Sequence, residues 1–568
     1  MSLGAEASAK AARDVEQVAA LTRAFLARFF ESEITTGADD LKGTFFWLLA
    51  ALATPGIVIP WIMVFDWNFM SIVHGYEGLR LASRAEKAFY LGLSMFSAGA
   101  LTTIVWSSLL PDKRDTLILG SLPVRPRTVI LAKLAALAGY IGVAAFATHV
   151  VGSLFWGSIL GNNGPGFFVI RSIIAHFVAS AALSMFVCLA IAAAQGMLLT
   201  ITGPRLFPRA STVLQAAVVG LLAISLAWLP IITVAARQTI GGGPRAEPWI
   251  LALPPMWFLG LYEWILGTNE PVIGMLARRA VLAFGGMIAL TLLTYPLAFR
   301  RLMVSVVESG QPPQAPLSRA IRWCIVRAAG RDSAARAAAE FFVTTVARVE
   351  RQRFMVAIGI GIALAWTLPG LRSYEPSAAP QPQILALPIA AMMFLLAGLR
   401  IASSLPADVR AGWVFEVHDI SRRRARQALE RVMIVVGVLP PILLSAPFYW
   451  RLWGGAVMLT HAALMLALGV AIVELLIWHC NGMPCGGRFV PTRLDFGRRW
   501  PVHAVFFLIV VSVIPRLEAW LFRSELGAII FVSLLLVGAF AVRYASSRHV
   551  IVPIYDDVDP VAGVLRIN

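Results

Sequence analysis

Long apolar runs are the feature that most constrains how this chain can fold. A helix needs about 20 mainly apolar residues to cross the hydrocarbon core of a membrane, which is about 30 Å thick. We count twelve such runs, over residues 44–65, 88–110, 129–156, 171–201, 213–236, 278–299, 354–371, 384–402, 431–447, 454–479, 502–521 and 525–543. They predict an all-α, polytopic membrane protein with about twelve transmembrane helices.

Composition and charge distribution agree with this fold class. Of the 568 residues, 58% are hydrophobic and 14% are charged, whereas globular domains are about half apolar and a quarter charged. With the N-terminus placed in the cytoplasm, 36 of the 48 Lys and Arg residues fall on the inner side and 12 on the outer side. This positive-inside bias accounts for the net charge of +17 by topology in a lipid bilayer and argues against a nucleic-acid partner. We expect a multi-pass protein of the bacterial cytoplasmic membrane with both termini in the cytoplasm.

Two amphipathic segments precede long groups of spans. Within residues 1–43, Val18, Leu21, Phe25 and Phe29 recur at helical spacing opposite a charged face. This pattern predicts a helix lying in the membrane interface with its apolar face in the lipid headgroups; packing on a soluble partner is the alternative. A second interfacial helix is expected from Arg336 to Arg353, before the seventh predicted span.

A local internal repeat indicates duplication. Residues 403–410 align with residues 107–114 at an offset of 296, with five of eight positions identical and both segments following a second span of a group. Six spans return the chain to the same side, so two such halves run parallel, related by a pseudo-twofold axis along the membrane normal. The expected organisation is 1–43 interfacial N-terminal helix, 44–300 first transmembrane half, 301–353 cytoplasmic linker and second interfacial helix, 354–543 second transmembrane half, and 544–568 cytoplasmic tail.

The sequence predicts two different kinds of connection between spans on the outer side of the membrane. Residues 66–87 are predicted to form a short loop of mixed charge. Residues 237–277 contain an aromatic run interrupted by three prolines, which favours a re-entrant or interface-lying segment over a span. Trp249, Trp257 and Trp264 are suited to the headgroup level.

Motifs for catalysis or metal binding are absent from the sequence. No Gly-Lys pair occurs, so a G-x-x-x-x-G-K-[ST] phosphate-binding loop is excluded. His479, Cys480 and Cys485 are close in sequence but lack a fourth ligand and a recognised zinc spacing. We therefore expect no catalytic residue, no metal site and no cofactor in this chain.

Ionisable residues inside predicted spans are candidates for an intramembrane polar site because they are costly to place in lipid. Glu474 is the strongest candidate, followed by His461 and His176. Helix packing is the alternative for all three. Arg516 and Glu518 lie near the end of the eleventh predicted span, where we expect them to snorkel to the interface.

The stretch from Pro111 to Lys133, PDKRDTLILGSLPVRPRTVILAK, lies between the second and third predicted spans. It is charged at its start, apolar in its middle and basic at its end. The leucine-rich run, the Leu122-Pro123-Val124 turn, the two arginines and the Ala-Lys pair resemble the inner loop of ABC-2-type exporter permeases. The first interfacial helix is similar to that family's elbow helix, and the segment from Pro254 to Phe258 is similar to its outer re-entrant element.

This resemblance implies a permease subunit of an ATP-binding-cassette exporter, working by alternating access. ATP and Mg would be bound by separate ATPase subunits, which grip this loop as a coupling helix. The residues expected to dock the ATPase are Asp112, Lys113, Arg114, Asp115, Leu117, Leu119, Leu122, Pro123, Arg125 and Arg127. A weaker second set is Asp408, Arg410, Trp413, Phe415, Arg422 and Arg423, because the Leu-Pro-Val turn is missing there.

Two other functions remain open from the sequence. A secondary transporter of the major-facilitator type also has parallel six-span halves, although its signature loop is only faintly echoed at residues 112–114. A membrane-embedded transferase is less favoured, since it needs clustered carboxylates or histidines at one membrane face. The transported substrate is unknown; short outer loops favour a lipophilic small molecule.

Overall fold

In a computed structural model of the chain, every element among the described residues is helical. The structure describes residues 14–27, 50, 53–110, 124–161, 168–240, 248–306, 322–323, 325–328, 332–372, 379–405, 422–478, 485, 500–522 and 524–548. No strand occurs in these ranges, which confirms the prediction of an all-α chain.

The chain divides into two compact units, and each is described by itself. Unit 1 comprises Met1–Gln314, Ile360–Ser373 and Val490–Leu494. Unit 2 comprises Ala315–Gly359, Tyr374–Phe489 and Asp495–Asn568.

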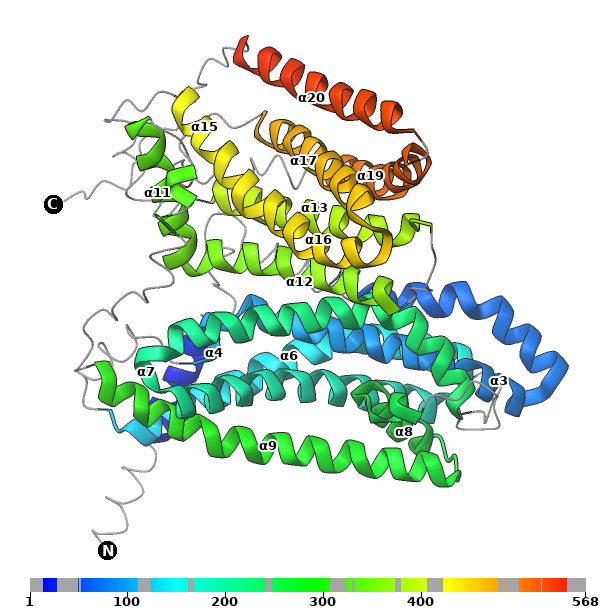
Figure 1. Cartoon of the computed structure of the whole chain (residues 1–568). Coiled ribbons are helices and arrows are strands. Elements are labelled where there is room, and N and C mark those ends of the chain that lie inside the picture. The colour runs from blue at the N-terminus through cyan, green and yellow to red at the C-terminus, as the bar shows by residue number, and fades with distance from the viewer. Residues whose placement is uncertain are drawn as a thin grey trace, which may run out of the picture. The chain divides into compact units, whose positions relative to one another are not determined.

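Long helices build unit 1 (Figure 1). They are α3 (Pro55–Ile104), α4 (Trp106–Leu109), α6 (Pro126–Gly161), α7 (Phe168–Ile240), η1 (Pro248–Ala252), α8 (Pro254–Ile265) and α9 (Pro271–Val306), preceded by a helical segment over residues 14–27. The first six predicted spans all fall on these helices where the chain is described.

Helices α3 and α7 each bend at a glycine. They have 50 and 73 residues, so if straight they would reach about 75 Å and about 110 Å, far beyond a hydrocarbon core of about 30 Å. Gly75 and Gly203 adopt φ values of 66° and 70°, a region that glycine reaches without a Cβ clash. The predicted loop over residues 66–87 is therefore wrong: the backbone there is helical apart from Gly75.

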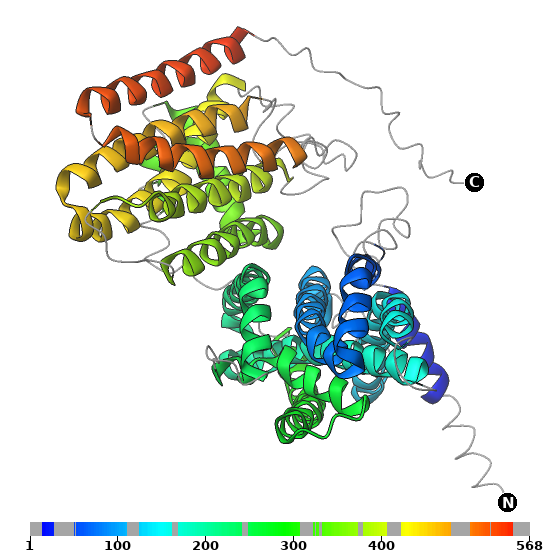
Figure 2. The same ribbon diagram turned by 90° about the vertical axis from the view of Figure 1, so that its right-hand side faces the viewer.

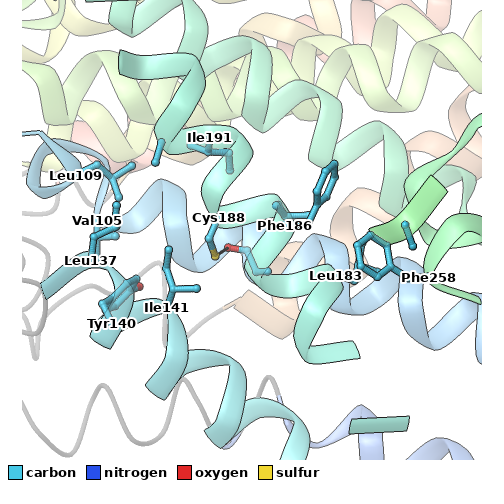
Figure 3. Packing of buried hydrophobic residues seen from close by; sticks show 14 of the residues in the cluster. Val105, Leu109, Leu137, Tyr140, Ile141, Leu183, Phe186, Cys188, Ile191 and Phe258 are labelled. Atoms are coloured by element: carbon cyan, nitrogen blue, oxygen red, sulfur yellow. Dashed lines mark hydrogen bonds between the residues drawn. The ribbon is translucent and has the colours of Figure 1, made fainter. Parts of the chain in front are cut away.

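Apolar side chains from α3, α4, α6, α7 and α8 form the core of unit 1. Figure 3 shows part of it: Val105 and Leu137 lie together at one side of the view, and Leu183 and Phe258 lie together at the other. Two tyrosines donate to carbonyls in the last turns of α3 and α4: the Tyr140 hydroxyl to that of Leu101 at 3.2 Å and the Tyr295 hydroxyl to that of Leu109 at 2.6 Å. Because lipid is as apolar as these side chains, close packing rather than removal from water stabilises such contacts in a membrane.

The N-terminal helix packs on α6. Phe25 is buried, and the ammonium of Lys133 lies 4.7 Å from its ring centroid. The Thr22 hydroxyl lies 3.4 Å from the Ala132 carbonyl oxygen. The structure confirms a helix over residues 14–27, and Phe25 of its apolar face packs on α6; its position in the membrane interface stays a prediction. Phe29 lies outside the described residues.

The proline-rich segment after α7 folds into two short helices. Helix η1 begins at Pro248 and α8 at Pro254, as expected because proline lacks an N–H and suits a first helical turn. Helix α8 buries one face against α9, α7 and α3. Trp249 and Trp264 are 42% and 58% exposed, whereas the Trp257 indole donates to the Leu251 carbonyl at 3.0 Å. With 12 residues, α8 is too short to cross a membrane.

Unit 2 is a second bundle of helices (Figure 1). Its elements are α11 (Ser333–Arg348), residues 350–359 of α12 (Glu350–Arg372), α13 (Pro382–Ser404), α15 (Arg422–Met433), η2 (Ile434–Val438), α16 (Leu439–Trp453), α17 (Gly455–Ile477), α19 (Trp500–Leu521) and α20 (Glu525–Arg548). Helix η2 is a π-helical turn that joins α15 to α16. Both views place α20 on the outside of the unit, where it packs on α17 (Figures 1 and 2).

Small residues allow close helix crossings in unit 2. A Cβ added to Gly398 of α13 would lie 2.8 Å from the Met355 carbonyl oxygen, and one added to Gly359 would lie 2.7 Å from that of Phe394. Close backbone approach at small residues is typical of helix pairs in membranes. Helix α11, the second predicted interfacial helix, buries Phe342 in the core that it forms with α15.

Seven described helical stretches are long and apolar enough to cross a membrane. They are Pro126–Ile159, Phe168–Pro204, Pro271–Arg301, Pro382–Ser404, Arg424–Trp453, Gly455–Ile477 and Leu526–Ala545. Three shorter apolar stretches, Pro55–Phe65, Ala210–Leu226 and Gln352–Thr367, coincide with further predicted spans. By length and composition the chain is a multi-pass helical membrane protein, and the count of twelve stays a prediction.

Candidate functional site

The residues predicted to dock an ATPase are only partly described. Asp112 to Pro123 lie outside the described residues, while Arg125 and Arg127 lie at the start of α6 with exposed side chains. The guanidinium of Arg125 lies 3.3 Å from the carboxylate of Asp14 in the N-terminal helix. The two arginines are therefore accessible at the point where the predicted coupling stretch enters α6.

The second predicted set lies around the start of α15. Asp408, Arg410, Trp413 and Phe415 lie outside the described residues; Arg422 and Arg423 are in the first turn of α15, and the structure describes their backbone only.

A second aspartate–arginine pair lies at the start of α15. Asp332 accepts a hydrogen bond from the Ala334 N–H at 3.0 Å, capping α11, and lies 3.0 Å from Arg424. We call this pair and the Asp14–Arg125 pair the two clasps. Each clasp is an ion pair between a residue at the described start of an amphipathic helix and an arginine at the start of the helical stretch that leads into the third predicted span of its half. Sequence reasoning missed both clasps because the partners are far apart along the chain.

A buried charge cluster joins α3 to α8 and to the α8–α9 connection in unit 1. Lys87 lies 2.6 Å from Glu263, with side chains 2% and 0% exposed. Arg84 lies 2.6 Å from Glu270 and 3.7 Å from Glu263. The Thr268 hydroxyl donates to the second oxygen of Glu263 at 3.1 Å. The only sequence signal was an isolated glutamate within the apolar run 254–266.

Aromatic rings surround His176 beside this charge cluster. The ring of Trp156 in α6 stacks on the imidazole at 4.9 Å between centroids. Tyr90 of α3 and Tyr262 of α8 lie at 4.6 Å and 5.6 Å. The ammonium of Lys87 lies 4.9 Å from the Tyr262 ring centroid, so the aromatic and charged groups form one continuous polar region.

The two buried histidines of this region have different surroundings. His149 has partners at both ring nitrogens: Tyr90 at 3.1 Å and Ser184 at 2.7 Å. Neither ring nitrogen of His176 has a hydrogen-bond partner. Sequence alone could not separate them, since each is a lone histidine within an apolar run.

Unit 2 buries a histidine–glutamate pair. Nδ1 of His461 in α17 lies 2.6 Å from Oε1 of Glu518 in α19, with side chains 2% and 0% exposed. The Tyr449 ring lies 4.8 Å from the imidazole, and its hydroxyl donates to the Ile384 carbonyl at 2.7 Å. The expectation that Glu518 snorkels is wrong, because His461 provides a buried partner. Arg516 is exposed and donates to the Ser512 carbonyl of its own helix.

Glu474 belongs to an ion-pair network that holds three helices. Its carboxylate lies 2.9 Å from Arg426 of α15 and 3.7 Å from Arg543 of α20, and Arg543 also lies 2.9 Å from Glu430. Glu474 and His461 lie 13 positions apart on α17, which separates them by about 20 Å along the axis. His176 lies in unit 1. The three predicted intramembrane candidates therefore belong to three separate arrangements.

Cys485 is held against the end of α13. Its N–H donates to the Ser403 carbonyl at 2.8 Å, and its thiol lies 3.4 Å from the Ala402 carbonyl oxygen. Burial raises the pKa of the Cys485 thiol to about 12. His479 and Cys480 lie outside the described residues. Within the described ranges, no group of three or more His, Cys, Asp or Glu side chains could hold a metal ion.

Comparison of the chain with known proteins found no match. No family model matches the sequence, and neither the curated proteins nor the solved structures include a match.

Proposed function

We propose that this chain is the membrane-spanning permease subunit of an ATP-binding-cassette exporter in the cytoplasmic membrane of a bacterium, with both termini in the cytoplasm. Separate ATPase subunits bind ATP and Mg and drive alternating access through the stretch 111–127 and, less strongly, through 406–426. The observation that carries this proposal is the pair of clasps, Asp14–Arg125 and Asp332–Arg424, each adjoining one of these stretches.

The clasps support a duplicated architecture of two parallel six-span halves. In each half an amphipathic helix contacts the start of the third span. A second correspondence lies at the other end of the same span, where Trp156 stacks on His176 and Tyr449 contacts His461. In both cases the aromatic residue is at or just after the end of the third predicted span and the histidine is early in the fourth. Parallel repeats about an axis along the membrane normal are a common architecture of transporters.

A single helix, α3, leads from the docking stretch back to the buried Lys87–Glu263 contact. Helix α3 ends at Ile104, just before residue 111, and Lys87 lies 17 residues earlier on the same helix. This separation is about 26 Å along the helix axis. A displacement of the stretch by an ATPase would therefore reach the Lys87–Glu263 contact and α8 through a rigid element.

The N-terminal helix would move together with the docking stretch. Phe25 and Lys133 form a buried cation–π contact, and Asp14 holds Arg125 beside it. The chain itself has no Gly-Lys pair and so no phosphate-binding loop of the usual kind. Hydrolysis of ATP is therefore assigned to the partner, as expected if a neighbouring gene encodes an ATPase.

Co-purification with that ATPase tests the proposal. Arg125→Glu and Arg127→Glu reverse the exposed charge at the start of α6, and we expect each to reduce the amount of ATPase recovered. Arg278→Glu, a charge reversal at another exposed arginine on α9, is the control and should leave recovery unchanged. A disulfide between a cysteine at Leu119 and one on the ATPase surface should form in the wild-type background. An intact complex without this cross-link would refute the docking assignment.

A secondary transporter is the second candidate, favoured by the buried Lys87–Glu263 and His461–Glu518 pairs. Ionisable groups at membrane depth often carry protons in ion-coupled transporters. The two mechanisms are separated by substrate movement in vesicles that lack the ATPase. Uptake or efflux driven by a proton gradient alone would favour the secondary transporter.

A further inference from the structure

Five buried polar atoms in unit 1 have no hydrogen-bond partner and lie in one neighbourhood. They belong to Trp67 of α3, Trp156 of α6, and Ser172 and His176 of α7: the two indole nitrogens, the hydroxyl oxygen and both imidazole nitrogens. None of the four residues is more than 2% exposed. We call these residues the unpaired cluster. Buried polar groups are nearly always hydrogen-bonded, so this concentration points to a partner that is not part of the chain.

The members of the unpaired cluster are adjacent. Trp156 stacks on His176 at 4.9 Å and lies 5.2 Å from Trp67, measured between ring centroids. Ser172 is one helical turn before His176, and residues four apart lie on the same face of a helix. Three helices therefore bring these side chains together without pairing their polar atoms.

His149 shows that this region can satisfy an imidazole. Tyr90 and Ser184 occupy both of its ring nitrogens. An unpaired imidazole in an apolar setting destabilises the fold, whereas a phenyl group at position 176 would have no polar atom to satisfy. The two nitrogens of His176 are therefore better explained by a bound molecule than by packing.

The chemistry of the unpaired cluster defines its ligand. An indole N–H can only donate, and a hydroxyl and an imidazole can each donate and accept, so donors outnumber acceptors and favour a ligand oxygen. Aromatic rings form the walls. The neighbouring charges, Arg84 and Lys87 with Glu263 and Glu270, already compensate one another. A charged ligand would remain uncompensated and so pay a large desolvation penalty.

We propose that the unpaired cluster binds a small neutral molecule with an aromatic body and one hydroxyl or carbonyl oxygen. This inference rests on the proposed function, because it names the class of molecule that the permease exports. The five atoms are covered in the described conformation. Entry of the ligand therefore requires a movement that opens this part of unit 1, and collective movements of helices occur within microseconds to milliseconds.

Fluorine NMR with two matched probes tests this site. The full-length protein in lipid nanodiscs is titrated with 4-fluorophenol, which has the required oxygen, and with 4-fluorotoluene, which has a methyl group instead. We expect wild-type protein to bind 4-fluorophenol more tightly than 4-fluorotoluene. His176→Phe should weaken 4-fluorophenol binding about fivefold, the effect of one lost hydrogen bond, and leave 4-fluorotoluene binding unchanged.

Ser172→Ala is a second, smaller change and should weaken 4-fluorophenol binding in the same direction. His176→Phe should unfold at the same temperature as wild type or higher, which excludes misfolding as the cause. Equal affinity of wild type and His176→Phe for 4-fluorophenol would overturn the proposal, as would wild-type protein that does not distinguish the two probes; water alone would then be the partner of these atoms.

ATPase recovery separates this inference from the proposed function. His176 is not a residue of the docking stretch, so His176→Phe should recover as much ATPase as wild type. If the ATPase docks but wild type and His176→Phe bind 4-fluorophenol equally well, the proposed binding site is wrong and the permease proposal stands. If the probes behave as expected and no ATPase docks, the site stands and the ATP-driven mechanism is wrong.

Discussion

The ammonium of Lys87 lies 2.6 Å from the carboxylate of Glu263, although 176 positions separate the two residues. Both side chains are buried. Through this contact the short helix α8, which cannot cross a membrane by itself, is held against the long helix α3. A buried pair of this kind fixes one arrangement of the two helices, because either charge alone would be costly in the interior.

Lys87→Met should therefore destabilise the protein by about 3–5 kcal/mol, since Glu263 loses the closer of its cationic partners in a buried site. Lys87→Met combined with Glu263→Gln should regain most of that loss, because no uncompensated charge remains. Thermal unfolding of the purified variants measures both effects. A single variant as stable as wild type would show that the pair does not hold α8 in place.

Gly203→Ala should destabilise the protein by about 1–3 kcal/mol, the cost of holding a non-glycine residue in a sparsely populated backbone region. The positive φ of 70° at Gly203 causes this loss of stability, because no atom lies within 4 Å of the added Cβ and a steric clash is therefore excluded. Gly142→Ala is the control: it lies inside α6 with equally open surroundings and no positive φ, and should gain about 0.5–1 kcal/mol. Equal effects of the two substitutions in thermal unfolding would refute the kink at Gly203.

Glu474→Gln should destabilise the protein by about 1.5–3 kcal/mol, the usual loss for a hydrogen bond to a charged group, because Arg426 loses its carboxylate partner. Glu340→Gln, on the exposed side of α11, should change stability by no more than about 0.5 kcal/mol. Transport by the Glu474→Gln variant should keep the pH dependence of wild type. Loss of that dependence would assign Glu474 to proton transfer instead of helix packing.

Cys485 should resist alkylation in the folded protein. Burial raises the pKa of its thiol to about 12, above the ordinary value of about 8.5, and only the thiolate reacts with iodoacetamide. At pH 8 the folded protein therefore presents almost no reactive form at this position, and denaturation restores it. Mass spectrometry of the alkylated peptides measures the difference; equal labelling before and after denaturation would contradict it.

Helix positions could be predicted because apolar runs of about 20 residues are typical of membrane-spanning helices. The runs 129–156 and 454–479 correspond closely to parts of α6 and to α17. The region 66–87 was predicted wrongly because its charged residues are typical of a loop. In the structure, Arg84 is instead paired with Glu270 of the α8–α9 connection and Lys87 with Glu263 of α8, partners that lie 186 and 176 positions away in the sequence.

The contacts of the candidate site were beyond sequence reasoning for a related cause. An amphipathic helix has the same periodicity whether its apolar face meets lipid or protein, so the packing of Phe25 on α6 could not be inferred. Likewise, His149 and His176 have similar apolar neighbours in sequence, and only the three-dimensional arrangement separates the paired imidazole from the unpaired one. Pairing of distant polar atoms is a tertiary property.

The bend of α3 at Gly75 determines how the sidedness of this protein can be measured. Inserted epitopes and protease sites are tolerated in irregular, exposed chain, and the backbone over residues 66–87 is helical except at that glycine. A tag placed there would interrupt a helix. A single cysteine in place of Ile72, which is 84% exposed and three residues before the bend, would instead report from which side of the membrane an impermeant reagent reaches it.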